Sequence, residues 1–267
     1  MDLGLLDHVK KNILDLIKLE KRIDNRKLLE FRKPISIIPN ISKNAEGSCM
    51  VKWGNTVVMA GVKIDVGEPF PDTPDQGILI VNAEFLPGAH PTYEPGPPGP
   101  EAIELARVVD RTIRESEMID LKKLVIKEGE KVWSIFIDIY VLNDDGNVID
   151  PSVLASVVSL LLAKLPKYDE EKGKVIYGEK TDQSLPIQTI PISVTFGKIE
   201  NKIILDPCKY EEIALSSAIT ISYLEKGEIC SIQKYGSFSF SLEELDKIIE
   251  WGYDKSKILR RKIKRII

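Results

Sequence analysis

The stretch Glu94–Glu115 reads EPGPPGPEAIELARVVDRTIRE. Its first part is typical of a rigid loop, because proline lacks a backbone N–H and fixes the φ angle. From Glu101 onward, apolar residues recur at the spacing of a helix, which predicts a helix over residues 101–117. We expect its buried apolar stripe to contain the following residues: Ile103, Ala106, Val109 and Ile113.

The same predicted helix carries three arginines on one face. Arg107, Arg111 and Arg114 stand at positions i, i+4 and i+7, so their side chains project in similar directions. Three guanidinium groups about a turn apart can follow the phosphates of a nucleic-acid strand. The alternative is an ordinary solvated face, in which neighbouring acids such as Asp110 and Glu104 pair with the arginines. The residues alone leave both interpretations open.

Around this stretch, strands and helices alternate in two similar halves, residues 1–185 and 186–267. Residues 168–185 are polar and are expected to form an irregular connection between the halves. Grouped strands and helices of this kind indicate an α+β fold, with mixed sheets and helices packed between or against them. The other predicted helices cover residues 5–17, 151–165 and the stretch from Ser241 onward, and the predicted strands cover residues 35–38, 48–52, 56–64, 78–85, 124–126, 132–142, 188–196, 202–205, 215–224 and 228–235.

The composition excludes several classes of function. With 37 Lys and Arg against 41 Asp and Glu, the net charge of -4 argues against a freestanding basic nucleic-acid binder, although a local basic site is still possible. Cys49, Cys208 and Cys230 lack metal-ligand spacing, so neither a metal site nor a cofactor is expected. No apolar run approaches the roughly 20 residues that a membrane helix needs. The N-terminal residues do not look like a signal peptide, so we expect a soluble, cytoplasmic protein.

Several segments together resemble the RNase PH family, and within it the non-catalytic ring subunits of archaeal exosomes. They are Arg22–Arg26, Glu30–Arg32, Gly47–Val51, Gly54–Ala60 and Glu94–Glu115. The proline loop followed by the arginine helix is the most specific of them, and the resemblance extends over roughly residues 20–262. It implies an RNase-PH-like fold of two similar β/α halves, with a leading helix in the first half.

The active members of this family degrade RNA from its 3′ end, with phosphate as the attacking group. The resemblance implies that they need a Gly-Ser-Arg-like turn for phosphate and a carboxylate shortly after an acidic pair. Here the turn is Asp145–Val148, without the serine or the arginine, and Asp144 and Asp145 would repel phosphate. The acidic pair is Glu211-Glu212, but Ser216–Ala218 stands where the carboxylate is expected. We therefore expect no catalytic residues in this chain.

The resemblance implies a subunit that alternates with a catalytic RNase-PH-like paralogue in a ring of three heterodimers, with RNA-binding cap subunits on one face. Arg107, Arg111 and Arg114 would bind the phosphates of single-stranded RNA and help to structure the paralogue's active site. One alternative is a self-sufficient phosphorolytic 3′-to-5′ exoribonuclease, in which Asp206, Glu211 or Glu212 replaces the missing acid. Another alternative is the same fold with a ligand other than RNA.

Two smaller features also allow more than one interpretation. Arg22, Asp24, Arg26 and Arg32 could face RNA, but we favour an internal ion-pair network that fixes the start of the fold. Tyr93, in the proline loop, either stacks on a base or packs rigidly within the loop.

Overall fold

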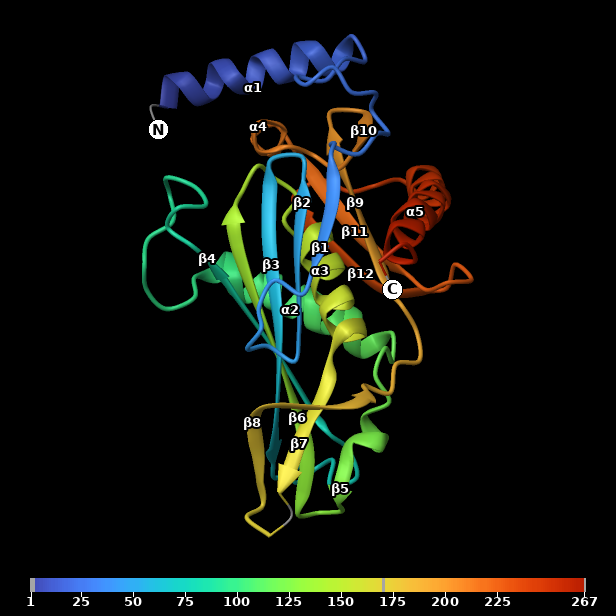
Figure 1. Cartoon of the computed structure of the whole chain (residues 1–267). Helices are drawn as coiled ribbons and strands as arrows, with labels where there is room; N and C mark the ends of the chain where they lie inside the picture. The colour runs from blue at the N-terminus through green and yellow to red at the C-terminus, as the bar shows by residue number, and fades with distance from the viewer. Residues whose placement is uncertain (1–2, 170, 267) are drawn as a thin grey trace.

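The computed structural model describes residues 3–169 and 171–266, and its strands form two main sheets and one long hairpin (Figure 1). In the first sheet the strand order is β1-β2-β3-β6-β4, with β5 paired to β6. Strand β4 runs parallel to β6, and every other pairing in this sheet is antiparallel. The strands are β1 (Ile35–Pro39), β2 (Gly47–Trp53), β3 (Thr56–Gly67), β4 (Ile78–Phe85), β5 (Val125–Lys127) and β6 (Lys131–Asn143).

The second sheet has the order β10-β9-β11-β12 and is antiparallel throughout. A separate hairpin of β7 and β8 extends from one end of the molecule (Figure 1). These strands are β7 (Lys164–Asp169), β8 (Lys174–Ser184), β9 (Ile192–Ile199), β10 (Lys202–Leu205), β11 (Ser217–Tyr223) and β12 (Ile229–Gly236).

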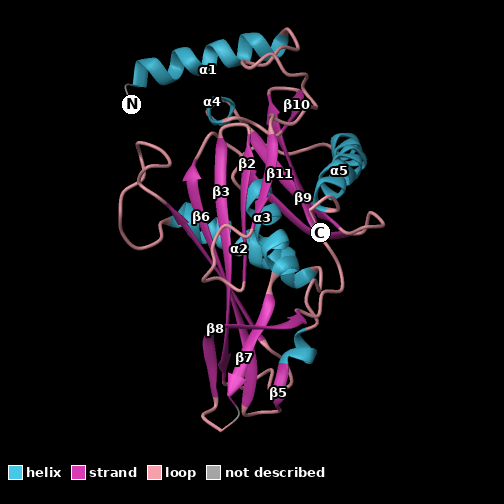
Figure 2. Cartoon of the chain, viewed as in Figure 1, coloured by secondary structure: helices cyan, strands magenta, loops and turns pink. Residues whose placement is uncertain are grey.

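The helices occupy the space between and beside the sheets. Figure 2 shows α3 at the centre of the molecule and α1 lying across one end. Helix α2 packs on β4, α3 and β12, while α5 packs on β9 and β11. The helices are α1 (Leu3–Lys18), α2 (Pro100–Glu115), the 3-10 turn η1 (Leu121–Leu124), α3 (Ile149–Leu162), α4 (Lys209–Glu212) and α5 (Leu242–Ile263).

Helix α3 is buried on nearly all sides, as its apolar sequence predicts. It contacts β2 and β3 of the first sheet and β9 of the second, so it joins the two sheets into one core. Two of its buried serines, Ser152 and Ser159, satisfy their hydroxyls by donating to backbone carbonyls. Ser159 Oγ, for example, donates to Ala155 O at 2.8 Å and lies 3.1 Å from Ala60 O of β3.

Two sequence-based expectations were wrong. Ile103 was placed on the buried stripe of its helix, but its side chain is 60% exposed. The buried face instead runs along Ala102, Leu105 and Val109, because α2 is covered by β4 on one side and by α3 on the other. Residues 168–185 were predicted to be irregular, but most of them form strand β8. The side chains of β8 are largely exposed on both faces, so its sequence lacks the alternation of apolar and polar residues that indicates a strand.

Other expectations were confirmed. The hairpin of β2 and β3 turns at Gly54 and Asn55, and Trp53 pairs with Thr56 across it. The closing helix begins after Ser241, whose hydroxyl accepts from Glu244 N at 3.1 Å while the Glu244 carboxylate accepts from Ser241 N at 2.8 Å. None of the helices within residues 3–169 and 171–266 is long and apolar enough to cross a membrane.

The contact between the β2–β3 hairpin and α3 yields a stability prediction. A methyl group on Gly47 would collide with Ser159 O and lie 2.9 Å from Ala163 N, whereas one on Gly61 would meet Ala45 Cβ at an ordinary 3.9 Å. We expect Gly47→Ala to lower the free energy of unfolding by about 2 kcal/mol or more. Gly61→Ala, the matched control, should leave it within about 1 kcal/mol. Urea unfolding of both variants measures this, and equal stabilities would contradict the tight hairpin–helix contact.

Candidate functional site

The turn Asp144–Val148 connects β6 to α3 and lies against the second half of the chain. Gly146 has a φ of 87° and Asn147 a φ of 38°, so both adopt the left-handed conformation that such a tight turn requires. A methyl group on Gly146 would collide with the backbone of Cys208 and Lys209. The turn is therefore closely packed against the segment that leads into α4.

Two backbone N–H groups of this turn are already satisfied by carboxylates of the same chain. Gly146 N donates to Asp144 Oδ1 at 2.9 Å, and Asn147 N donates to Glu212 Oε1 at 2.8 Å. Consecutive N–H groups at a turn before a helix form a site that suits an anion. In this chain the anions are its own side chains, and a phosphate would have to displace them and approach two negative charges.

Asp144 is held in this position by a cation and a phenol. Its side chain is 2% exposed and accepts hydrogen bonds from Lys209 Nζ and from Tyr93 Oη, the latter at 2.6 Å. Burial alone would raise the pKa of Asp144, but the bonds from Lys209 and Tyr93 outweigh it and keep the pKa below its usual range. Lys209 also lies 3.5 Å from Glu212. This lysine is thus neutralised by two carboxylates and is not free to bind phosphate.

Tyr93 packs within the proline loop, which favours the structural interpretation of this residue over base stacking. Its ring lies against Phe85, with centroids 4.7 Å apart, and its hydroxyl is bonded to Asp144. The loop that leads into α2 is therefore tied to the Asp144–Val148 turn. The link between Tyr93, Asp144 and Lys209 leaves no signal in the sequence, because these residues belong to three separate segments without a shared motif.

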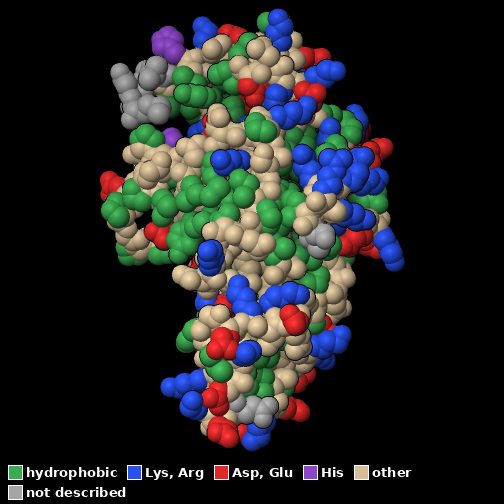
Figure 3. All heavy atoms as spheres, in the orientation of Figure 1, with side chains coloured by type: hydrophobic (Ala, Val, Ile, Leu, Met, Phe, Trp, Pro, Cys, Tyr) green, Lys and Arg blue, Asp and Glu red, His purple; other side chains and the backbone are tan. Residues whose placement is uncertain are grey.

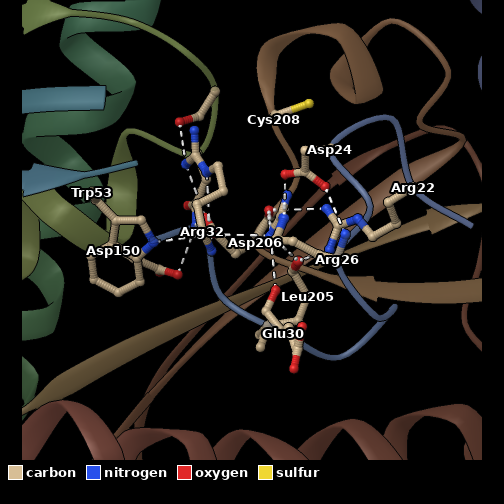
Figure 4. Close-up of polar contacts among 12 residues, drawn as sticks. Arg22, Asp24, Arg26, Glu30, Arg32, Trp53, Asp150, Leu205, Asp206 and Cys208 are labelled. Carbon is tan, nitrogen blue, oxygen red and sulfur yellow. Dashed lines mark hydrogen bonds and ion pairs between the residues drawn. The ribbon is translucent and has the colours of Figure 1, made fainter. Parts of the chain in front are cut away.

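The basic segment Arg22–Arg32 forms an internal ion-pair network with the second half of the chain, as predicted (Figure 4). Arg22 is buried and donates from Nε to Glu211 Oε1 at 2.7 Å and from Nη1 to Leu205 O at 2.6 Å. Arg26 also pairs with two carboxylates. Its Nε contacts the partly exposed Asp24, and its Nη2 lies 3.5 Å from Oε2 of the buried Glu211. Neither Arg22 nor Glu211 is accessible to a substrate.

The second ion pair of the network joins Arg32 to Asp206, which is fully buried. Arg32 donates to this carboxylate from Nη2 at 2.9 Å and from its backbone N at 2.7 Å. Trp53 Nε1 donates to it at 2.9 Å (Figure 4). Asn147 Nδ2 also donates to it, at 2.7 Å. Burial would raise the pKa of Asp206, but the charge and hydrogen bonds of Arg32 lower it below its usual range. Asp206 is therefore a structural anion.

Asp150, in the first turn of α3, is a buried carboxylate without a cation. Its oxygens accept from Asn147 Nδ2 at 2.9 Å and from the backbone N and the hydroxyl of Thr195 at 2.9 and 2.7 Å. Burial raises the pKa of Asp150 to about 7, with the nearby charge of Asp206 acting in the same direction. Asp150 is a site residue that the sequence did not reveal, and its only signal is its place at the start of a largely apolar helix.

The residues where an acid was expected contain no carboxylate and offer little chemistry. Ser217 begins β11 and is buried, and its Oγ has no hydrogen-bond partner among the described residues. Ser216 Oγ donates to Lys198 O at 3.1 Å. Glu212, the nearest acid of the pair, has its pKa raised by burial and is occupied by Asn147 N and Lys209. Among the described residues, no group of three His, Cys, Asp or Glu side chains could hold a metal ion.

The three arginines of α2 are exposed, but they differ in their partners. Arg107 pairs with Glu104 at 2.8 Å, and Arg114 pairs with Asp110 at 2.7 Å and also donates to Leu79 O. Arg111 has no hydrogen bond or ion pair with any residue of the described ranges. Exposed ion pairs of this kind contribute about 1 kcal/mol or less, so an incoming phosphate can replace them.

This chain belongs to the RNase PH family of 3′ exoribonucleases. The family's domain 1 matches residues 30–166, and its domain 2 matches residues 189–255. The predicted boundary between residues 185 and 186 falls between the two matched regions and stays a prediction.

Similar proteins come from archaea. The chain is 46% identical over 246 residues to the exosome complex component Rrp42 of Methanothermobacter thermautotrophicus, covering 92% of this chain and 90% of the relative. A solved structure of the Archaeoglobus fulgidus exosome with RNA bound to the active site contains a chain that is 44% identical. That similarity covers 97% of this chain and 98% of the other, with a TM-score of 0.89. A chain of an archaeal exosome core is 41% identical, with coverage of 97% and 98% and a TM-score of 0.86.

The buried ion pair at Asp206 gives a second prediction. Asp206→Asn leaves Arg32 with its charge buried and only partly compensated, so we expect a loss of about 3–5 kcal/mol in the free energy of unfolding. Asp246→Asn is the matched control, because Asp246 is exposed on α5, and it should change stability by less than about 0.5 kcal/mol. Denaturant titration at pH 7 measures both, and a small loss for Asp206→Asn would show that the pair is dispensable.

Asp150 gives a prediction of how the free energy of unfolding depends on pH. Asp150 should make the fold less stable as the pH rises, whereas a salt-bridged acid makes it more stable. Its folded-state pKa is raised to about 7, so the folded chain keeps this proton at pH values where the unfolded chain has lost it. The resulting stability is complete below the unfolded pKa near 4 and is lost as the pH rises to about 7. From pH 5 to pH 8, the wild type should therefore lose about 2 kcal/mol more than Asp150→Asn. Parallel urea-unfolding profiles for the two proteins would contradict the raised pKa.

Proposed function

We propose that this chain is a non-catalytic, RNA-binding ring subunit of an archaeal exosome, a complex that degrades RNA from its 3′ end. The observation that carries this proposal is the occupied turn at Asp144–Val148. Its N–H groups donate to Asp144 and Glu212, so the place that the family resemblance assigns to the attacking phosphate holds two carboxylates of the chain itself. The similarity to archaeal Rrp42 proteins over nearly the whole chain supports the same assignment.

The alternative of a self-sufficient phosphorolytic exoribonuclease needs an acid that can reach a substrate. Asp206 and Glu211 are both fully buried and are bonded to arginines of the Arg22–Arg32 segment. Glu212 is bonded to the turn and to Lys209. A proton donor or acceptor must come within hydrogen-bond reach of the reacting group. These three acids already bind groups of the chain itself. This geometry favours a helper subunit over an enzyme.

In the proposed assembly, Arg107 and Arg111 contact the phosphates of single-stranded RNA next to the active site of a catalytic paralogue. Arg111 is free of partners within the described residues, and Arg107 is held only by an exposed pair with Glu104. Arg114 contributes less, because its guanidinium also anchors the carbonyl of Leu79. Phosphate contacts of this kind position a strand without reading its sequence.

The proposed ring contains three such heterodimers, with RNA-binding cap subunits on one face, and it works in the cytoplasm. The net charge of -4 fits this division of labour, since the chain would bind RNA only together with its partner. The partner would supply the phosphate site and the acid.

The test is the phosphate-dependent release of nucleoside diphosphates from single-stranded RNA by the chain alone, by its catalytic paralogue alone and by their mixture. We expect no release by the chain alone and the fastest release by the mixture. In the mixture, Arg107→Ala with Arg111→Ala should weaken RNA binding about tenfold or more and reduce the slope of its salt dependence.

Two control variants accompany this experiment. Lys122→Ala with Lys123→Ala also removes two exposed positive charges, but from η1, and should leave RNA binding unchanged. Arg114→Ala should have a smaller effect than the Arg107 and Arg111 pair. Phosphate-dependent turnover by the purified chain alone would overturn the proposal in favour of the enzyme.

A further inference from the structure

A groove of about 750 Å³ lies between helix α5 and the segment that leads into strand β1. One wall is the segment that leads into β1, with Phe31, Pro34 and Ile35, and the other wall is α5, with Ile258. Ile258 is 38% exposed, so the groove presents an apolar surface to solvent. Glu30 and Phe31 belong to the Arg22–Arg32 segment described above, but neither the α2 arginines nor the Asp144–Val148 turn lines the groove.

The groove lies beside the start of an edge strand, whose first residue, Ile35, lines it. β1 is the outermost strand of the first sheet, and its hydrogen bonds to β2 include Gly54 N to Pro34 O and Asn40 N to Ser48 O. In an antiparallel pair, alternate residues direct their backbone groups toward the partner strand, so those of Ile35 and Ile37 point away from β2. Ile35 O accepts from Lys262 Nζ at 3.3 Å, and the other outward groups of these two residues lack a partner within the described part of the chain.

The rim of the groove is positively charged. Lys33, Lys255 and Lys262 line it against a single acid, Glu30, whose carboxylate already accepts from the backbone N of Lys27. Lys255 and Lys262 reach backbone carbonyls on the β1 side, which keeps their charges at the groove. Figure 3 shows Lys and Arg side chains gathered over α5 on this side of the molecule, although the chain as a whole is acidic.

We propose that this groove is a docking site for an extended acidic segment of a protein partner, which adds a strand to the free edge of β1. Main-chain hydrogen bonds to Ile35 and Ile37 would hold the segment, in the way that extended peptides bind between a strand edge and a helix. Its apolar side chains would enter the groove against Phe31 and Ile258. Its acidic side chains would pair with Lys33 and Lys262, which sets the charge of the partner.

The chemistry of the groove favours a polypeptide over RNA. Single-stranded RNA binds where exposed aromatic side chains stack on bases, and the one aromatic ring that lines the groove, Phe31, is only 7% exposed. A strand edge offers alternating N–H and C=O groups, which match a peptide backbone. This inference does not depend on the exosome proposal, because it uses neither the α2 arginines nor the turn before α3.

The test uses the full-length chain and a fluorescein-labelled peptide, Ser-Glu-Val-Glu-Val-Glu-Gly, with binding followed by fluorescence anisotropy. We expect saturable binding that weakens as salt is raised, because the contacts on the rim are electrostatic. Lys33→Glu with Lys262→Glu should weaken binding about tenfold. Lys33→Glu alone serves as the second variant, because the Lys33 side chain makes no hydrogen bond within residues 3–169 and 171–266 and its replacement removes no contact of the fold there. It should weaken binding in the same direction.

Three comparisons decide the outcome. Lys122→Glu with Lys123→Glu, a charge reversal of the same size on η1, should leave peptide binding unchanged. The peptide with lysine in place of glutamate, and the peptide with N-methylated valines, should both fail to bind. Equal binding by the N-methylated peptide would rule out strand addition. No binding of the acidic peptide, or competition by a single-stranded RNA oligonucleotide at equal strength, would overturn the proposal.

Discussion

Arg32 and Asp206 lie 174 positions apart in the chain, and the ion pair between them is almost completely shielded from solvent. Two buried charges are tolerated only when each is paired and its remaining hydrogen-bonding groups are satisfied. Asp206 meets this condition through Arg32, Trp53 and Asn147. Since Arg32 lies in family domain 1 and Asp206 in domain 2, this pair fixes how the two domains meet. The turn before α3 takes its place from the same contacts, through Asn147.

The same arrangement surrounds the turn before α3 with charged side chains of the chain itself. Asp144 and Glu212 take the N–H groups at the start of α3, and Lys209 balances both charges. The hydrogen bond from Tyr93 to Asp144 connects this turn to the loop that leads into α2. In the proposed assembly, the residues that exclude phosphate from this chain also hold the arginine helix in place for RNA. One polar cluster thus performs a structural task where the family resemblance implies a catalytic one.

The sequence predicts the parts of this molecule that depend on local pattern. Periodicity gives α1 and α2, the nearly continuous apolar run gives α3, and the hairpin residues around Gly54 give β2 and β3. Strand β8 was not predicted because its residues are polar on both faces. Ile103 was misplaced because the buried face of α2 is centred on Leu105 and Val109, and Ile103 lies outside it. Contacts between distant segments, such as the Tyr93–Asp144–Lys209 cluster, leave no periodic signal. The turn and the missing acid were found only through the family resemblance, and the structure adds that two N–H groups of the turn donate to carboxylates of the chain itself.

The central claim is that this turn no longer binds phosphate, and the amide signals of Gly146 and Asn147 report on it directly. A titration of the isotope-labelled chain with inorganic phosphate, followed by two-dimensional NMR, measures whether either N–H exchanges its carboxylate for the added anion. We predict that both signals stay at their positions throughout a titration well into the millimolar range, because Asp144 and Glu212 hold these donors. A saturable shift of both signals would contradict the claim, since it would place phosphate at a site that this chain could then use for catalysis.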